Sequence, residues 1–168
     1  MIKPRTQTPE LKINLVNGTK WDLNEQSPEN FTMIVVYRGK HCPVCKKQLS
    51  ELQKQLKDFI DKGVNVLAIS SDTKEKAQAT YEDWNIADIP LGYGFTIEDA
   101  RKWGLYISKG IKEEPDQFIE PGLFLIRPDG TLYSAYIQSM PFARPQWDDV
   151  LKGLEFVIKE DYPARGEA

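Results

Sequence analysis

Cysteine and histidine are scarce in this sequence. Its 168 residues include two cysteines and one histidine, and Cys42, Cys45 and His41 all lie in the stretch YRGKHCPVCKKQL. A small extracellular domain held by cross-links needs more cysteines than these. A structural zinc site is disfavoured, because it usually takes four ligands and these three residues lie too close in sequence to complete a tetrahedron easily. We expect no metal and no other cofactor.

Long apolar runs and strong net charge are also absent. No segment approaches the roughly 18 apolar residues that a membrane-spanning helix needs, and no apolar run follows the basic residues near the start. The formal net charge is -3 without a basic block, which disfavours nucleic acid and membrane surfaces as partners. We expect a cytoplasmic protein, in which a cysteine pair serves redox or metal chemistry.

Hydrophobic periodicity predicts an α/β fold. The stretch LKINLVNGTKWDL alternates around Asn17-Gly18 and predicts an N-terminal β-hairpin. Further strands are expected at 31–37, 64–70, 122–126 and 131–137, and helices at about 42–63, 72–84, 96–104 and 145–158. The order predicts one domain over residues 1–168, with a central mixed β-sheet and helices on both faces.

Several local features refine this outline. Asp72 and Glu75 have the spacing of a capping box for the second helix, and Pro145 suits the first turn of the last one. The stretch IPLGYG is too irregular to assign. Residues 108–121 follow neither period and are expected to form a loop. The tail, 162–168, is expected to fray.

The two cysteines are predicted to lie at the start of the first long helix. Unpaired backbone N–H groups and the positive end of the helix dipole favour a thiolate there, and the thiolate is the nucleophile. Pro43 suits the first turn because it lacks an N–H group. Arg38 and His41 would add positive charge if they face inward, and His41 is expected to tune or pack rather than to shuttle protons.

A spacing of three residues on one helical turn allows Cys42 and Cys45 to form a disulfide. A purely structural disulfide is disfavoured, because it would close a very short loop and would not persist in a reducing cell. The CxxC pair, placed between a buried strand and an amphipathic helix, therefore indicates redox chemistry.

The sequence resembles the AhpC/TSA peroxiredoxin-like branch of the thioredoxin superfamily. The resemblance spans most of the chain and is carried by TMIVVYRGKHCPVCKKQLSELQKQLKDFIDKGVNVLAISSD and by GLFLIRPDGTLYSAY. It is closest to the group called peroxiredoxin-like 2, which carries a CxxC motif. The resemblance implies a thioredoxin-like fold and a thiol redox function without specifying the substrate.

The peroxiredoxin active-site pattern is only partly present. Laid on this chain, its peroxide-attacking cysteine falls on Cys45, its threonine or serine on Cys42 and its proline on Arg38. The family's further arginine would fall just before GLFLI, where this sequence has Pro121. Arg38 and Arg144 are the candidates to replace that arginine.

Compared with thioredoxin instead, the same residues take other roles. Cys42 matches the attacking cysteine and Cys45 the resolving one. Pro121 matches the proline that precedes a strand with a cis peptide bond and shapes the substrate groove.

Three functions follow from these residues. The leading hypothesis is a thiol–disulfide oxidoreductase, in which Cys42 attacks a protein or small-molecule disulfide and Cys45 resolves the adduct. The second is a thiol peroxidase, in which Cys45 attacks a hydroperoxide and Cys42 condenses with the sulfenic acid. Both need a cellular thiol reductant. The third is a redox-sensing interaction module that presents exposed aromatic residues from the loop 106–120.

Overall fold

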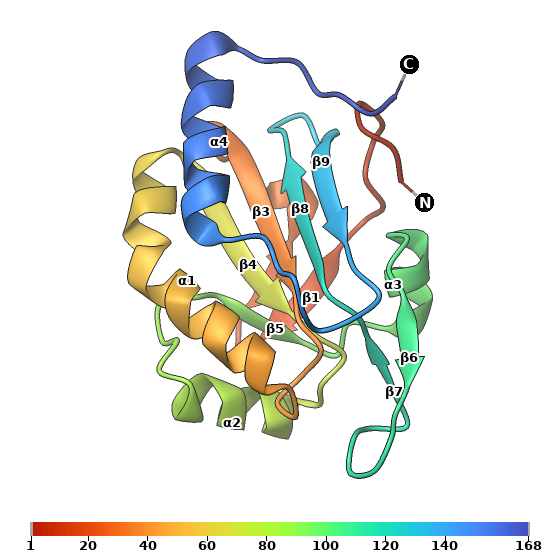
Figure 1. The fold of residues 1–168 in the computed structure, drawn as a ribbon. Helices are drawn as coiled ribbons and strands as arrows, with labels where there is room; N and C mark the ends of the chain where they lie inside the picture. The colour runs from red at the N-terminus through yellow and green to blue at the C-terminus, as the bar shows by residue number, and fades with distance from the viewer. Residues whose placement is uncertain (1, 168) are drawn as a thin grey trace.

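The computed structural model describes residues 2–167, and Met1 and Ala168 lie outside the described residues. Its centre is a mixed seven-stranded sheet in the order β2-β1-β5-β4-β3-β8-β9 (Figure 1). The strands are β1 (Lys12–Leu15), β2 (Lys20–Asp22), β3 (Phe31–Val36), β4 (Val64–Ile69), β5 (Leu91–Tyr93), β8 (Gly122–Ile126) and β9 (Leu132–Ile137). The helices are α1 (Pro43–Asp61), α2 (Lys74–Asp83), α3 (Ile97–Lys102) and α4 (Trp147–Glu160), with a short 3-10 helix at Leu23–Glu25.

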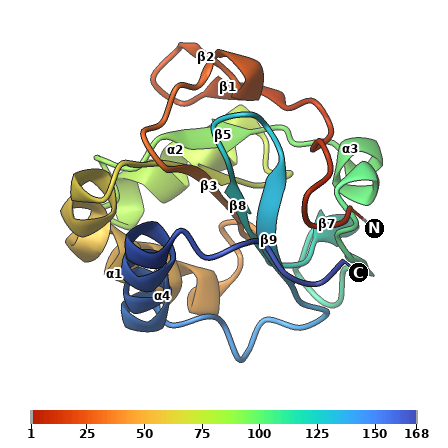
Figure 2. The same ribbon diagram turned by 90° about the horizontal axis from the view of Figure 1, so that it is seen from above.

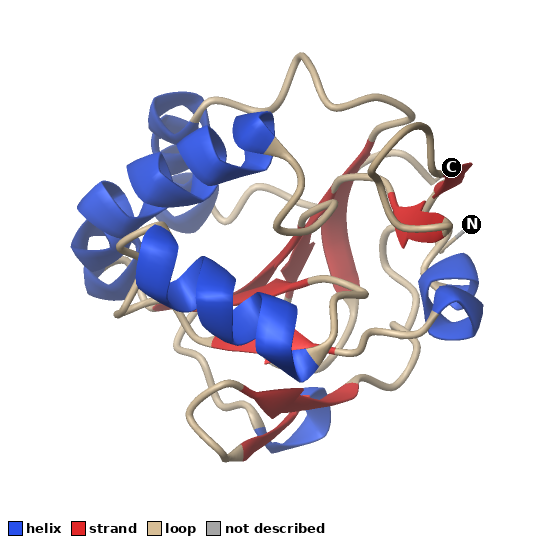
Figure 3. Ribbon diagram, turned by 90° about the horizontal axis from the view of Figure 1, so that it is seen from below, coloured by secondary structure: helices blue, strands red, loops and turns tan. Residues whose placement is uncertain are grey.

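The sheet is buried on both faces, as the sequence predicts. Along β3, Met33 and Val35 join one hydrophobic cluster while Ile34 and Val36 join the other, because successive side chains of a strand point to opposite faces. The first cluster includes residues of α1, α2 and α4, and the second includes Ala100 of α3. Figures 2 and 3 show α1 and α4 on one side of the sheet and α3 on the other. The predicted thioredoxin-like fold is confirmed.

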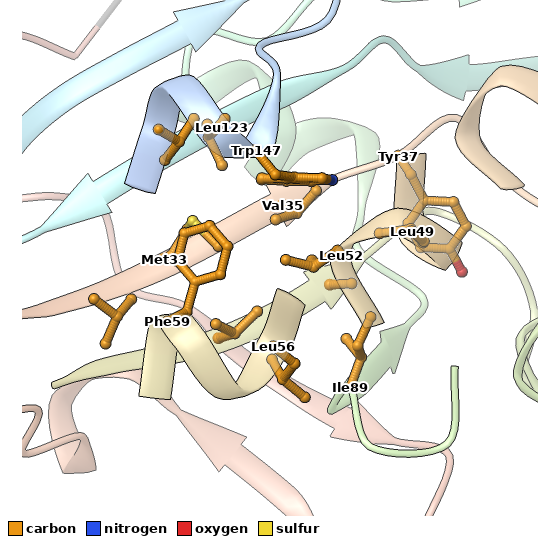
Figure 4. Packing of buried hydrophobic residues seen from close by; sticks show 14 of the residues in the cluster. Met33, Val35, Tyr37, Leu49, Leu52, Leu56, Phe59, Ile89, Leu123 and Trp147 are labelled. Carbon is orange, nitrogen blue, oxygen red and sulfur yellow. The ribbon is translucent and has the colours of Figure 1, made fainter. Parts of the chain in front are cut away.

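Helix α1 carries the main apolar stripe of the molecule. Its buried side chains recur every three or four residues, as expected of an amphipathic helix, and comprise Cys45, Gln48, Leu49, Leu52, Leu56 and Phe59. Figure 4 shows Leu49, Leu52 and Phe59 packed with Met33 and Val35 of β3 and with Trp147 of α4. This packing fixes the start of α1 at the end of β3.

Three local predictions need correction, and the structure defines one stretch that the sequence left unassigned. Thr73, not Asp72, caps α2 through its hydroxyl, which accepts from the Lys76 N–H. Leu91–Tyr93 of the unassigned stretch forms β5 because it pairs with both β4 and β1. Residues 108–121 are not all loop, since β6 (Ile107–Lys109) and β7 (Gln117–Ile119) pair as an antiparallel hairpin. Pro145 precedes α4, whose cap is Gln146.

The two ends of the chain lie side by side (Figure 1). Arg5 donates two hydrogen bonds to the carbonyl of Ala164, which is buried, and Lys3 pairs with Glu167. The described part of the tail, 162–167, is therefore attached to the N-terminal segment in this structure. Within residues 2–167, every helix is too short or too polar to cross a membrane.

Candidate redox-active site

The cysteine pair lies at the start of α1, just after the loop that follows β3. Cys42 is the N-cap of the helix, and its sulfur accepts a hydrogen bond from the Cys45 N–H at 3.3 Å. Pro43 occupies the first turn, where no N–H is needed. The Cys42 thiol thus takes the place of the Ser or Thr hydroxyl that usually caps a helix. Neither Cys42 nor Cys45 is exposed to solvent, whereas Pro43 is exposed.

The two sulfurs are in direct contact. Both cysteines are free thiols, and their Sγ atoms lie 2.6 Å apart. The Cys45 thiol donates to the Cys42 sulfur, so a single proton and a single negative charge can be shared by the pair. The same proximity means that disulfide formation requires little movement of the backbone.

The loop before the cysteines is held on the side of β4. The Lys40 N–H donates to the Asp72 carboxylate at 2.8 Å. Gly39 has a φ of +137°, and a Cβ atom there would lie 2.7 Å from Asp72 Oδ1. Only glycine fits this position, for reasons both of backbone angle and of space. Burial raises the pKa of the Asp72 carboxyl, and the Lys40 N–H opposes that effect.

Arg144 brings a cation to the pair from the segment between β9 and α4. Its Nη2 lies 3.3 Å from Cys45 Sγ and 4.0 Å from Cys42 Sγ. Nη1 donates to the side chain of Gln48, and Nε donates to the Pro141 carbonyl at 2.7 Å. The side chain is buried, and no carboxylate of residues 2–167 lies within 4.0 Å of it. A buried guanidinium needs an anion, and among the described residues the cysteine pair is the hydrogen-bond partner of Arg144 that can supply one.

The surroundings separate the acidities of the two thiols. A hydrogen bond from the Cys45 side chain is the main cause that lowers the pKa of Cys42 to about 6, and the Cys45 N–H, Arg144 and Arg38 act in the same direction against burial. Burial is the main cause that raises the pKa of Cys45, followed by its contact with Cys42. The resting pair therefore consists of a Cys42 thiolate that accepts the proton of the Cys45 thiol.

Arg38 contributes its backbone more directly than its side chain. Its N–H points at Cys45 Sγ, at 3.4 Å. Its guanidinium lies over the ring of Phe118 and pairs with Glu120 at 3.2 Å and with Glu114 at 3.6 Å. Two carboxylates therefore balance the charge of Arg38, whereas Arg144 has no carboxylate partner among residues 2–167. Of the two arginines that the sequence offers to replace the missing peroxiredoxin arginine, Arg144 has its guanidinium on Cys45.

His41 and Pro121 are placed differently from the cysteines. The His41 ring packs edge-on against Phe118, with ring centroids 4.8 Å apart, and burial, then Arg38, lowers its pKa. Pro121 is buried and its carbonyl accepts from the Gln138 N–H at 3.0 Å. The expected cis peptide bond before Pro121 is wrong, because all described peptide bonds are trans. Neither His41 nor Pro121 makes a hydrogen bond to either sulfur.

A groove beside the pair opens to solvent. It has a volume of about 190 Å³ and lies between the first turns of α1 and the segment that precedes α4. Its lining residues are Val44, Lys47, Gln48, Glu51, Phe142, Ala143, Arg144, Pro145, Gln146 and Trp147. Arg144 thus contacts the groove and both sulfurs. Within residues 2–167, no three His, Cys, Asp or Glu side chains form a group that could hold a metal ion.

The sequence does not reveal every residue that contacts the site. Gln48 orients Arg144 through its side chain, and its carbonyl accepts from the Trp147 indole at 2.9 Å. It is a polar residue on the apolar stripe of α1, one turn beyond Cys45. A polar side chain at a buried position indicates a polar partner inside the protein. Glu120 accepts from Ser108 at 2.6 Å besides pairing with Arg38. Nothing local to Glu120 in the sequence predicts this contact.

Comparison with known proteins agrees with this geometry. Residues 4–135 match the model of the AhpC/TSA family. The chain belongs to that family. It is 30% identical, over 134 residues, to a Mycobacterium tuberculosis protein named as a peroxiredoxin, covering 80% of this chain and 84% of the relative. It is 22% identical, over 153 residues, to the thiol peroxidase of Aquifex aeolicus, covering 90% of this chain and 82% of that protein.

Solved structures support the fold. The crystal structure of peroxidoxin BcpB from Mycobacterium tuberculosis superimposes with a TM-score of 0.75 at 17% identity, covering 94% of this chain and 99% of that one. As an AhpC/TSA member with a Cys42-x-x-Cys45 pair in contact, this protein is a peroxiredoxin-like oxidoreductase that uses thiol chemistry. Its departures from the family pattern are Cys42 in place of the threonine, Arg38 in place of the proline and Pro121 in place of the arginine.

Proposed function

We propose that this protein reduces hydroperoxides, with Cys45 as the sulfur that accepts the oxygen atom and Cys42 as the resolving cysteine. The observation that carries the proposal is the convergence of two donors, the Arg144 guanidinium and the Arg38 N–H, on Cys45 Sγ. Such donors would also stabilise the alkoxide that leaves when the peroxide O–O bond breaks. The peroxiredoxins and the thiol peroxidase among its relatives support the same chemistry.

The proton of the pair has a role at each step. Transfer of the Cys45 proton to Cys42 across the sulfur contact produces the Cys45 thiolate. That thiolate attacks the hydroperoxide to give a sulfenic acid, while the alkoxide takes the proton of Cys42 and leaves as the alcohol. The Cys42 thiolate then attacks the sulfenic sulfur, and hydroxide leaves and becomes water on taking up a proton from solvent. A cellular dithiol would reduce the resulting disulfide.

Burial favours a small substrate for the first step. Both sulfurs have no exposed surface, so a bulky protein disulfide cannot reach them in this conformation. A hydroperoxide could approach through the groove that Arg144 lines. A reducing compartment such as the cytoplasm would supply the thiol reductant.

Thiol–disulfide exchange led by Cys42 is the second candidate. The observation that favours it is the lowered pKa of Cys42, about 6, at the N-cap of α1. A thiolate that exists at neutral pH reacts with disulfides without prior proton transfer. In this scheme Cys42 attacks the substrate disulfide and Cys45 releases the reduced product.

Single cysteine substitutions distinguish the two schemes. Reduced wild type, Cys42→Ser and Cys45→Ser would each be reacted with hydrogen peroxide and with a small aromatic disulfide, and mass spectrometry would identify the adducts. Serine at position 42 keeps a good N-cap, so this variant should fold. We expect fast formation of a Cys45 sulfenic acid in Cys42→Ser, and a rate in Cys45→Ser no faster than that of the unfolded chain. Fast peroxide reaction in Cys45→Ser with none in Cys42→Ser would refute the peroxidase scheme.

A further inference from the structure

The segment from Ser139 to Pro145 is hydrogen-bonded to the body of the protein through one side chain. Among the described residues, its hydrogen bonds to the rest of the molecule beyond the adjoining Gln138 and Gln146 all come from Arg144, which donates to Gln48 and to the two sulfurs. Its other hydrogen bonds are local, such as those from Gln138 to the Phe142 and Ala143 carbonyls. Figure 1 shows the segment as the connection between β9 and α4.

The backbone of this segment is strained. Ala143 has a φ of +57°, in the left-handed region that is unfavourable for a residue with a Cβ. The side chains of Met140 and Phe142 are exposed, so they gain little burial in return. The segment therefore depends on the contacts of Arg144 to keep this conformation.

The attraction that holds Arg144 depends on the oxidation state of the cysteines. In the reduced pair, one thiol and one thiolate face the guanidinium. Formation of the Cys42–Cys45 disulfide removes two electrons and one thiol proton, with the electrons passing to a hydroperoxide or a substrate disulfide, and leaves both sulfurs uncharged. Because Gln48 is neutral and no carboxylate of residues 2–167 lies within 4.0 Å of the guanidinium, Arg144 would then be a buried cation without an ion-pair partner at contact distance.

We propose that Gln48 is a positioning residue, which orients Arg144 without neutralising it, so that the cysteine pair is the counter-ion of Arg144. Disulfide formation removes that counter-ion and therefore releases residues 139–145 from the protein body. The proposal rests on the ability of the pair to cycle between dithiol and disulfide, which is part of the proposed function. The part that moves is the segment before α4, and the cause is the loss of one negative charge. Release would uncover Trp147 and the start of α1 in the oxidised form alone.

Limited chymotrypsin digestion of the full chain tests this proposal. Cleavage after Phe142 reports release of the segment, and cleavage after the exposed Tyr106 in another loop serves as the internal reference. The protein would be reduced or oxidised in a dithiol–disulfide buffer without peroxide. We expect cleavage after Phe142 to be at least about tenfold faster in the oxidised form, since proteolysis follows the population of the open state. Equal rates in the two forms would overturn the proposal.

Three variants separate charge from disulfide geometry. Cys42→Ser combined with Cys45→Ser removes the anion without forming a bond, and we expect it to be cleaved as fast as the oxidised wild type even in reductant. Gln48→Glu supplies a permanent carboxylate, and we expect slow cleavage in both redox states. Gln117→Glu adds the same charge at an exposed position of β7 that does not line the groove of Arg144, and it should keep the wild-type redox difference. Slow cleavage of the double serine variant would show that charge is not the cause.

This experiment is independent of the peroxidase assay. If hydrogen peroxide does not react quickly but the redox difference in cleavage appears, the release mechanism stands and the peroxidase proposal fails. If peroxide reacts quickly at Cys45 but cleavage after Phe142 is insensitive to the disulfide, the opposite conclusion holds. Arg144→Lys keeps the positive charge and should retain part of the redox difference, whereas Arg144→Met should have none.

Discussion

Replacement of Arg144 by methionine should raise the pKa of the first thiol to ionise. The guanidinium lies 3.3 Å and 4.0 Å from the two sulfurs. Two unit charges at such distances interact by about 4–5 kcal/mol at an effective dielectric constant of about 20, which sets an upper bound near three pKa units at about 1.4 kcal/mol per unit. Arg144 acts on Cys42 after both contributions of Cys45, so we expect the lower part of this range, about 1–2 units.

The reactivity of the pair should follow this change. For a wild-type pKa of about 6, a rise of about 1–2 units lowers the thiolate fraction at pH 7 roughly 2- to 10-fold. Thiolate absorbance in the ultraviolet and the rate of alkylation by iodoacetamide, each followed from pH 4 to 10, would measure the pKa.

The control for this variant is Arg127→Met. Arg127 lies on the Tyr133 ring, away from both cysteines, so its replacement should leave the titration unchanged. An Arg144→Met protein that folds and titrates as the wild type does would refute the assignment of Arg144 as the counter-ion of the thiolate.

Three further predictions concern stability. Leu52→Ala should lower the free energy of unfolding by about 2–5 kcal/mol, because Leu52 is fully buried between α1 and the sheet; urea denaturation measures this, and a loss below 1 kcal/mol would contradict the packing. Gly39→Ala should destabilise the fold and slow alkylation of the pair, since the new Cβ would meet Asp72; Gly153→Ala, in open space on α4, is the control. The pKa of Cys42 is lower in the folded state than its ordinary 9.0, so its contribution to stability should be lost as pH falls from 9 through about 6. The reduced wild type should therefore gain stability over the double serine variant from pH 6 to 9, and a difference independent of pH would exclude a native thiolate.

Much of the architecture is determined locally. The alternating burial of β3 follows from a continuous run of apolar and β-branched residues, which suits a strand covered on both faces. Helix α1 follows from its apolar repeat, and its start follows from Pro43 and a side chain that can cap at Cys42. The cysteine contact is local as well, because residues three apart on one helical turn are neighbours. These features depend on interactions between residues close in sequence, which the sequence pattern records.

The tertiary structure decided what surrounds the sulfurs. Arg144 reaches Cys45 across 99 residues of chain, and its selection over Arg38 depends on where Glu120 and Glu114 lie, not on any local pattern. The β6–β7 hairpin and the short strand β5 escape local prediction because three-residue strands are stabilised by their partners. The different acidities of the two thiols likewise depend on burial and on the position of Arg144. The sequence alone determined that this chain has a reactive dithiol at a helix start, and long-range packing determined which sulfur receives which donor.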